Sequence, residues 1–171
     1  MITNMFEDLE KDVRKVKVPK ENREISWLEC EQGDVLRVWR KFPIPYMHYA
    51  IYTEEAKVIH FAGLEKDFWI FDDIYTHEAP FSHFLLDANR FEIVKYKKSY
   101  NPDEIVRRAY ERLNRRGYSL LFNNCEHFAV YCATGEKRSQ QVETVGLVLV
   151  NGVVYAATTA IPVTRPLRFF V

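Results

Sequence analysis

The stretch that decides the fold is Asn123–Ala129, which reads NNCEHFA. It follows Tyr118–Phe122, an apolar run (YSLLF) typical of a short strand. Asn124 is a preferred N-cap residue, because its side-chain oxygen accepts a hydrogen bond from an unpaired amide of the first helical turn. We therefore predict a strand that turns into a helix here, with Cys125 in the first turn. The positive end of the helix dipole would favour a thiolate at that position.

The alternative for Cys125 is a buried structural cysteine beside a capping asparagine. A predicted β-hairpin upstream, over residues 46–61, favours a catalytic role instead, because its strands contain His48 and His60. If the turn centres on Glu54, the two histidines face each other with Cβ atoms about 5 Å apart. Two histidines of one hairpin and a later cysteine are the parts of a thiol nucleophile with its base.

Acyl transfer through a cysteine requires a thiolate, a base and hydrogen-bond donors for the oxyanion. We predict that Cys125 is the nucleophile, that His48 is the base and later the acid, and that His60 orients His48 through its other ring nitrogen. The backbone amide of Cys125 is one expected oxyanion donor; the sequence does not identify the second. His127 lies about 200° around a helix from Cys125, so we expect it to be structural.

Two further histidines, His77 and His83, lie near Asp72 and Asp73 in the sequence. Their spacing matches no metal-ligand pattern, so we predict neither a metal nor a cofactor.

Composition limits the classes of function. A chain of 171 residues suits one domain with short extensions, and its 24 basic and 24 acidic residues give no net field for nucleic acid. Cys30, Cys125 and Cys132 form no paired framework, which indicates a reducing compartment. Residues 1–20 alternate in charge and do not resemble a secretory signal, so we expect a cytoplasmic protein.

We expect three segments. Residues 1–24 place apolar side chains at helical spacing and predict an amphipathic helix, ended by Pro19, with a polar link. Residues 25–142 form the catalytic domain. Residues 143–171 form an apolar segment in which 144–164 carry no charge, long enough for a helix that anchors the protein in a membrane. The alternative for this segment is a set of apolar strands packed on the domain.

Four motifs together resemble the lecithin:retinol acyltransferase-like (LRAT domain) family: Gly33-Asp34, YMHYAIY at 46–52, VIH at 58–60 and NCEHF at 124–128. The resemblance covers about residues 30–142. It implies a circularly permuted papain-like (NlpC-type) α+β fold, in which helices pack on an antiparallel sheet. It also implies a Cys-His-His site, formed here by Cys125, His48 and His60.

The resemblance further implies a thiol-dependent acyltransferase or phospholipase A. Such an enzyme moves an acyl group from a glycerophospholipid to an amine, an alcohol or water, at a membrane surface. Two alternatives stay open: a cysteine peptidase or amidase of the same superfamily, and a non-catalytic binding module. The apolar C-terminal segment favours lipid as the substrate.

Overall fold

The structure is a computed structural model that describes residues 9–41, 46–62, 74–115, 121–136, 145–150 and 153–158. The chain divides into two compact units, Met1–Lys137 and Arg138–Val171. The first unit contains β1 (Glu10–Lys17), the 3-10 helix η2 (Arg23–Glu29), β2 (Val35–Arg40), β3 (Tyr46–Tyr52), β4 (Lys57–Ala62), β5 (Tyr75–Pro80), α1 (Phe81–Leu85), β6 (Arg90–Tyr96), α2 (Pro102–Tyr110) and α3 (Leu121–Thr134).

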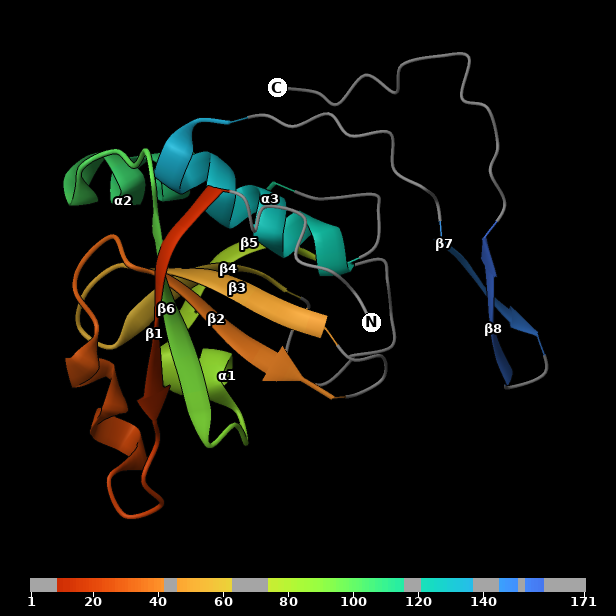
Figure 1. The fold of residues 1–171 in the computed structure, drawn as a ribbon, viewed down its shortest axis with the longest axis horizontal. Helices are drawn as coiled ribbons and strands as arrows, with labels where there is room; N and C mark the ends of the chain where they lie inside the picture. The colour runs from red at the N-terminus through yellow and green to blue at the C-terminus, as the bar shows by residue number, and fades with distance from the viewer. Residues whose placement is uncertain are drawn as a thin grey trace. The chain divides into compact units, whose positions relative to one another are not determined.

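The six strands of this unit form one antiparallel sheet in the order β1-β6-β2-β3-β4-β5 (Figure 1). Helices α2 and α3 cover one face, where Tyr49 and Ile51 of β3 belong to the same core cluster as Ala129 of α3. Helix α1 covers the other face, where Phe84 packs in a cluster with Val38 of β2. Because side chains alternate along a strand, the four central strands β6, β2, β3 and β4 each contribute to both cores. The predicted α+β class, an antiparallel sheet with helices packed on it, is confirmed.

The N-terminal helix predicted within residues 1–24 is wrong where the structure describes it. Glu10–Lys17 is strand β1, which pairs antiparallel with β6 and sets Val16 opposite Phe91. The valines at 13 and 16 are β-branched, and alternating charged residues are common on a strand at the edge of a sheet. Residues 1–8 lie outside the described residues.

The C-terminal unit contains two strands, β7 (Val145–Val150) and β8 (Val153–Thr158), where we predicted an apolar helix. They pair antiparallel with Val150 opposite Val153. Asn-Gly separates the strands in the sequence, which is typical of a two-residue hairpin turn, and the segment is rich in β-branched valine. These residues are therefore strands and not a helix. Among the described residues, no helix is long and apolar enough to span a membrane.

Helix α2 begins with residues that are typical of a helix start. Asn101 is the N-cap, and its Oδ1 accepts a hydrogen bond from the amide of Glu104 at 2.9 Å. Pro102 occupies the first helical position, where the missing N–H costs nothing. This helix and α3, which contains the cysteine of the candidate site, together cover one face of the sheet.

Candidate active site

Three histidines from three neighbouring strands form a continuous chain of rings. Nε2 of His48 on β3 lies 3.0 Å from Nδ1 of His60 on β4. Nε2 of His60 lies 3.2 Å from Nε2 of His77 on β5. His60 is paired with Ala50 across the hairpin, so the predicted register, with His48 directly opposite His60, is off by two residues. A shift of two residues preserves the face of the sheet, and the two rings still meet.

His77 is the member of this chain that the sequence did not reveal. It was considered only with Asp72 and Asp73, as a metal ligand, and those two aspartates lie outside the described residues. The structure instead pairs His77 with His60 across β4 and β5. Within the described part of the chain, no group of His, Cys, Asp or Glu side chains could hold a metal ion. Recognising YTHEAP as a strand next to β4 would have placed His77 beside His60.

The two inner rings of the chain are deeply buried. His48 is 3 % and His60 is 4 % exposed. The ring of Phe84 from α1 covers His48, with ring centroids 5.8 Å apart. Burial, followed by neighbouring positive groups, lowers the pKa of His48 well below its usual value. The same causes lower the pKa of His60 to about 3, so both rings are neutral near pH 7.

Cys125 lies in the second turn of its helix, because α3 begins at Leu121. The predicted strand therefore does not include Leu121 and Phe122, and Asn124 is not an N-cap. The sequence is compatible with this earlier start, because Leu121 and Phe122 are apolar and precede Cys125 by four and three positions, which is helical spacing. Further along, the buried stripe of α3 consists of Cys125, Phe128, Ala129, Cys132 and Ala133.

This position changes the chemistry expected of Cys125. Its side chain is fully buried, and burial raises the pKa of the thiol to about 12, although the nearby backbone amide of Tyr49 lowers it in part. Sγ contacts the carbonyl oxygen of Met47 at 3.7 Å. Cys125 is thus a neutral thiol in this structure, not the thiolate that we predicted. Its backbone amide, which we predicted as an oxyanion donor, lies in the second turn of α3, and that role stays a prediction.

The cysteine and His48 both lie at β3 but have different neighbours. Sγ contacts the main chain of β3 at the carbonyl of Met47, whereas the ring of His48 packs against Phe84 of α1. Tyr46, the first residue of β3, is close to both. Its ring centroid lies 6.0 Å from that of His48, and burial together with the nearness of Cys125 raises its pKa.

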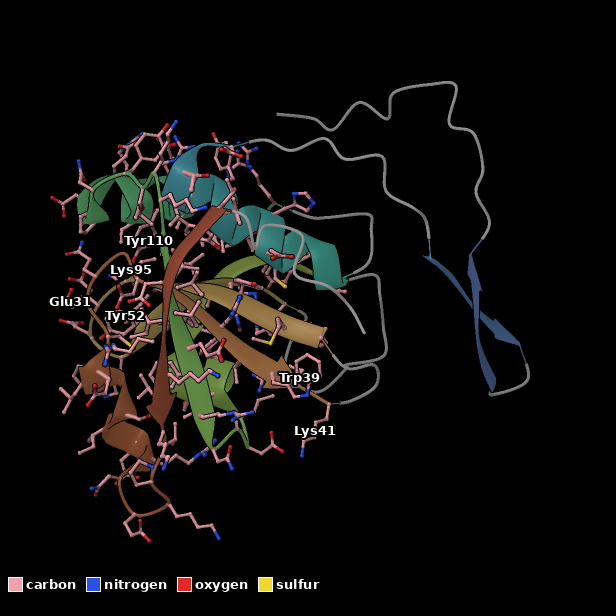
Figure 2. All side chains as sticks on the ribbon, in the orientation of Figure 1. Glu31, Trp39, Lys41, Tyr52, Lys95 and Tyr110 are labelled. Atoms are coloured by element: carbon pink, nitrogen blue, oxygen red, sulfur yellow. The ribbon has the colours of Figure 1, made fainter. Side chains whose placement is uncertain are left out.

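An exposed tryptophan lies on the face of the sheet against which α3, with Cys125, packs. Trp39 is opposite Met47 in the pairing of β2 with β3, and its side chain is 44 % exposed. Figure 2 shows Trp39 and Lys41 at the end of β2. The carbonyl of Met47 is the group that contacts Sγ, so this indole is an apolar surface close to the candidate nucleophile.

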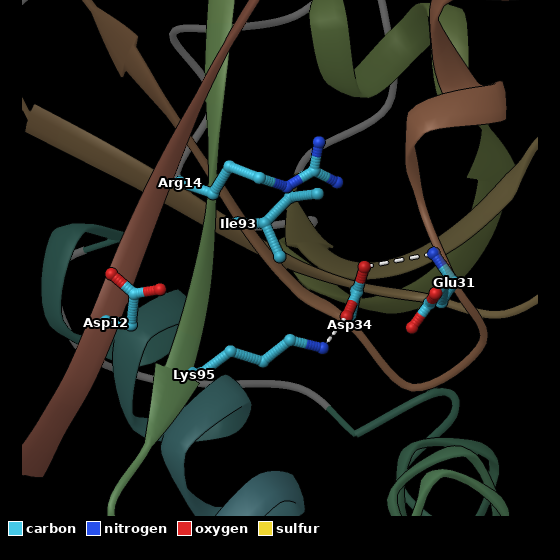
Figure 3. Close-up of a pocket in the computed structure, with 6 residues that line it drawn as sticks. All are labelled: Asp12, Arg14, Glu31, Asp34, Ile93 and Lys95. Atoms are coloured by element: carbon cyan, nitrogen blue, oxygen red, sulfur yellow. Dashed lines mark hydrogen bonds and ion pairs between the residues drawn. The ribbon is translucent and has the colours of Figure 1, made fainter.

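Asp34 of the Gly33-Asp34 motif has a structural role. Its carboxylate accepts a hydrogen bond from the amide of Glu31 at 2.9 Å and pairs with Lys95 (Figure 3). The surrounding cavity of about 300 Å³ is lined by Asp12, Arg14, Glu31, Asp34, Ile93 and Lys95. None of these is a predicted site residue, so the cavity is separate from the histidines and Cys125.

Comparison with known proteins places the chain in a family. The family described as lecithin retinol acyltransferase matches residues 28–138. This protein belongs to that family. The resemblance predicted from the four motifs is therefore confirmed.

Curated relatives of this LRAT-family chain include three enzymes by name. Lecithin retinol acyltransferase of Mus musculus is 30 % identical over 146 residues, which cover 71 % of this chain and 62 % of the relative. Phospholipase A and acyltransferase 5 of Homo sapiens is 32 % identical over 127 residues, which cover 65 % of this chain and 43 % of the relative. Phospholipase A and acyltransferase 1 of Mus musculus is 31 % identical over 133 residues, which cover 68 % of this chain and 77 % of the relative. The chain thus spans less than two thirds of the length of the first two.

Proposed function

We propose that this LRAT-family protein is a thiol-dependent acyltransferase or phospholipase A that acts on glycerophospholipids, with Cys125 as nucleophile, His48 as base and His60 orienting His48. The observation that carries the proposal is at His48. Its Nδ1 is buried and has no hydrogen-bond partner within the described residues, whereas its Nε2 is held by His60. A general base requires such an unoccupied lone pair. The names of the relatives supply the class of reaction and the lipid substrate.

The proposed reaction has two halves. Nδ1 of His48 takes the proton of Sγ, the sulfur attacks the acyl carbonyl carbon, and the ester C–O bond breaks as the imidazolium returns the proton to the leaving oxygen. The acyl group is then held on Cys125 as a thioester. An amine, an alcohol or water attacks that carbonyl, His48 takes the proton of the acceptor, and the sulfur leaves and regains a proton from His48.

This reaction requires a rearrangement from the conformation described above. Sγ must leave the carbonyl of Met47 and come within about 3–3.5 Å of Nδ1 of His48. Catalytic contacts of this kind often form only in the complex with substrate. The neutral ring of His48 already has the protonation state that the first step needs.

Phosphatidylcholine labelled in one acyl chain tests the proposal, with and without an amine acceptor. Wild type is expected to release or transfer the label, and Cys125→Ser and His48→Gln are expected to lose this activity. His83→Gln is the matched control, because His83 is a histidine of α1 outside the chain of three rings. Label release that persists in Cys125→Ser would remove the proposed nucleophile. Cleavage of peptides without turnover of any lipid would favour the peptidase alternative.

We also propose that the protein acts at a membrane surface, to which the uncharged β7–β8 segment contributes. Truncation after Val142 is expected to lower co-sedimentation with phosphatidylcholine vesicles while turnover of a soluble short-chain phosphatidylcholine persists. Equal co-sedimentation of the full and truncated chains would contradict this part of the proposal alone.

A further inference from the structure

The chain of three histidine rings ends on a group that cannot donate a hydrogen bond. Nδ1 of His77 lies 3.2 Å from the backbone carbonyl oxygen of Tyr75. A carbonyl oxygen only accepts, so Nδ1 of His77 must carry a hydrogen. When the ring of His77 is neutral it has one N–H, and its Nε2 is then an acceptor.

The donor and acceptor roles in one ring determine those in the next ring. Because Nε2 of His77 accepts, Nε2 of His60 must donate across the 3.2 Å contact. The Nδ1 of neutral His60 is then an acceptor, so Nε2 of His48 must donate across the 3.0 Å contact. Neutral His48 is left with a bare Nδ1, and this is the buried nitrogen without a hydrogen-bond partner among the described residues.

We propose that His77 is a positioning residue that, through the carbonyl of Tyr75, fixes the tautomers of His60 and His48 and leaves the lone pair of His48 on Nδ1. This inference rests on the proposed function, because the free lone pair serves catalysis only if His48 acts on Cys125. It adds a third histidine and a backbone group to the expected Cys-His-His site.

The reverse assignment of donors and acceptors is unfavourable at both ends of the row of three rings. Nδ1 of His77 would then set a lone pair against the oxygen of Tyr75. Nδ1 of His48 would carry a buried N–H without an acceptor, which is costly in a protein interior. The lowered pKa values of His48 and His60 keep both rings neutral, so each holds a single N–H and the polarity is well defined.

Nitrogen NMR of the imidazole rings tests the proposal on the full chain without substrate. In ¹⁵N-labelled protein near neutral pH, we expect the proton on Nε2 of His48 and His60 and on Nδ1 of His77. A proton on Nδ1 of His48, or on both nitrogens of His77, would overturn the proposal. The spectrum does not depend on turnover, so a protein inactive on lipids would still give this result, and an active one with reversed tautomers would refute this inference alone.

Two variants test whether His77 sets the tautomer. His77→Leu removes the acceptor for His60 and is expected to give mixed tautomers at His48, with kcat lowered about tenfold or more and KM unchanged. His77→Gln keeps an acceptor oxygen and is expected to restore both readouts, while His83→Gln changes neither. An unchanged His48 spectrum in a folded His77→Leu protein would overturn the proposal. If that variant does not fold, the wild-type spectrum decides.

Discussion

Nδ1 of His60 lies 3.0 Å from Nε2 of His48, although His60 is paired across the hairpin with Ala50. The contact is diagonal across β3 and β4, and it is possible because both side chains lie on the face covered by α1 and the small side chain of Ala50 leaves room for both rings. Each strand thus places one ring, and we propose that the contact between the rings orients His48.

Removing His60 should therefore reduce catalysis without removing the base. In His60→Ala, Nε2–H of His48 loses its acceptor and the ring loses its orientation. We expect kcat with labelled phosphatidylcholine to fall by roughly 10²-fold. Wild-type kcat in a folded His60→Ala protein would show that His48 works without this partner.

Stability should decrease as the pH falls below the usual histidine range. The buried rings stay neutral in the folded protein, with the pKa of His60 at about 3, whereas in the unfolded chain they bind protons near the ordinary value of 6.5. The contribution of the neutral rings to the free energy of unfolding is therefore fully present above about pH 6.5. Below that pH, the free energy of unfolding falls by roughly 1.4 kcal/mol per pH unit for each ring, until the pKa of that ring in the folded protein is reached. The midpoint of urea unfolding, measured at neutral and mildly acidic pH, checks this. His60→Gln should show a smaller change than wild type.

Cys125 should react slowly with iodoacetamide in the absence of lipid. A pKa near 12 instead of 9 lowers the fraction of thiolate at neutral pH about a thousandfold, and the side chain is fully buried. Mass spectrometry of the peptide that contains Cys125 should show alkylation slower by at least this factor in the native protein than in concentrated urea. Phosphatidylcholine should accelerate the reaction if substrate draws Sγ away from Met47. Rapid alkylation without lipid would mean that the resting sulfur is a thiolate.

Trp39 should sense lipid. Its exposed indole lies on the face of the sheet against which α3 packs, and tryptophan favours the interface between water and lipid. Its fluorescence should shift to shorter wavelength when phosphatidylcholine vesicles are added. Trp39→Phe should remove most of this shift while Trp27 and Trp69 remain. The same shift in the variant would place lipid contact elsewhere.

Gly33 should tolerate no side chain. Its φ is +80°, and a Cβ atom there would lie 2.7 Å from Cα of Pro102 at the start of α2. Gly33→Ala is expected to lower the free energy of unfolding by more than about 1 kcal/mol, measured by urea denaturation. Gln32→Ala, at the exposed neighbouring position, is the control and should stay close to wild type.

The elements that the sequence predicts well are those whose signals are local. The hairpin of β3 and β4, the strand at Arg90–Tyr96 and the helix capped by Asn101 follow from alternation, β-branched residues and cap chemistry. His48 and His60 could be placed on one face for the same reason, because a register error of two residues leaves the face unchanged.

The features that the sequence does not predict depend on contacts between distant segments. Strand β1 forms because β6 offers it an edge, despite spacing that also fits a helix. Helix α3 starts one turn earlier than the preference of Asn124 for a cap predicts. His77 reaches the site only through the pairing of β5 with β4, and nothing local in its sequence marks it.

The carbonyl of Tyr75 belongs to β5, the outermost strand of the sheet on its side. The outer edge of that strand is tied at Thr76, whose amide donates to the carbonyl of Arg115 at 3.1 Å and whose carbonyl accepts from the amide of Asn114 at 2.7 Å. A main-chain oxygen cannot be deleted by changing a side chain, but it can be displaced. A substitution in the turn after α2, which is bonded to β5 next to His77, should therefore shift the carbonyl of Tyr75 and change which ring nitrogens of the three histidines carry a hydrogen.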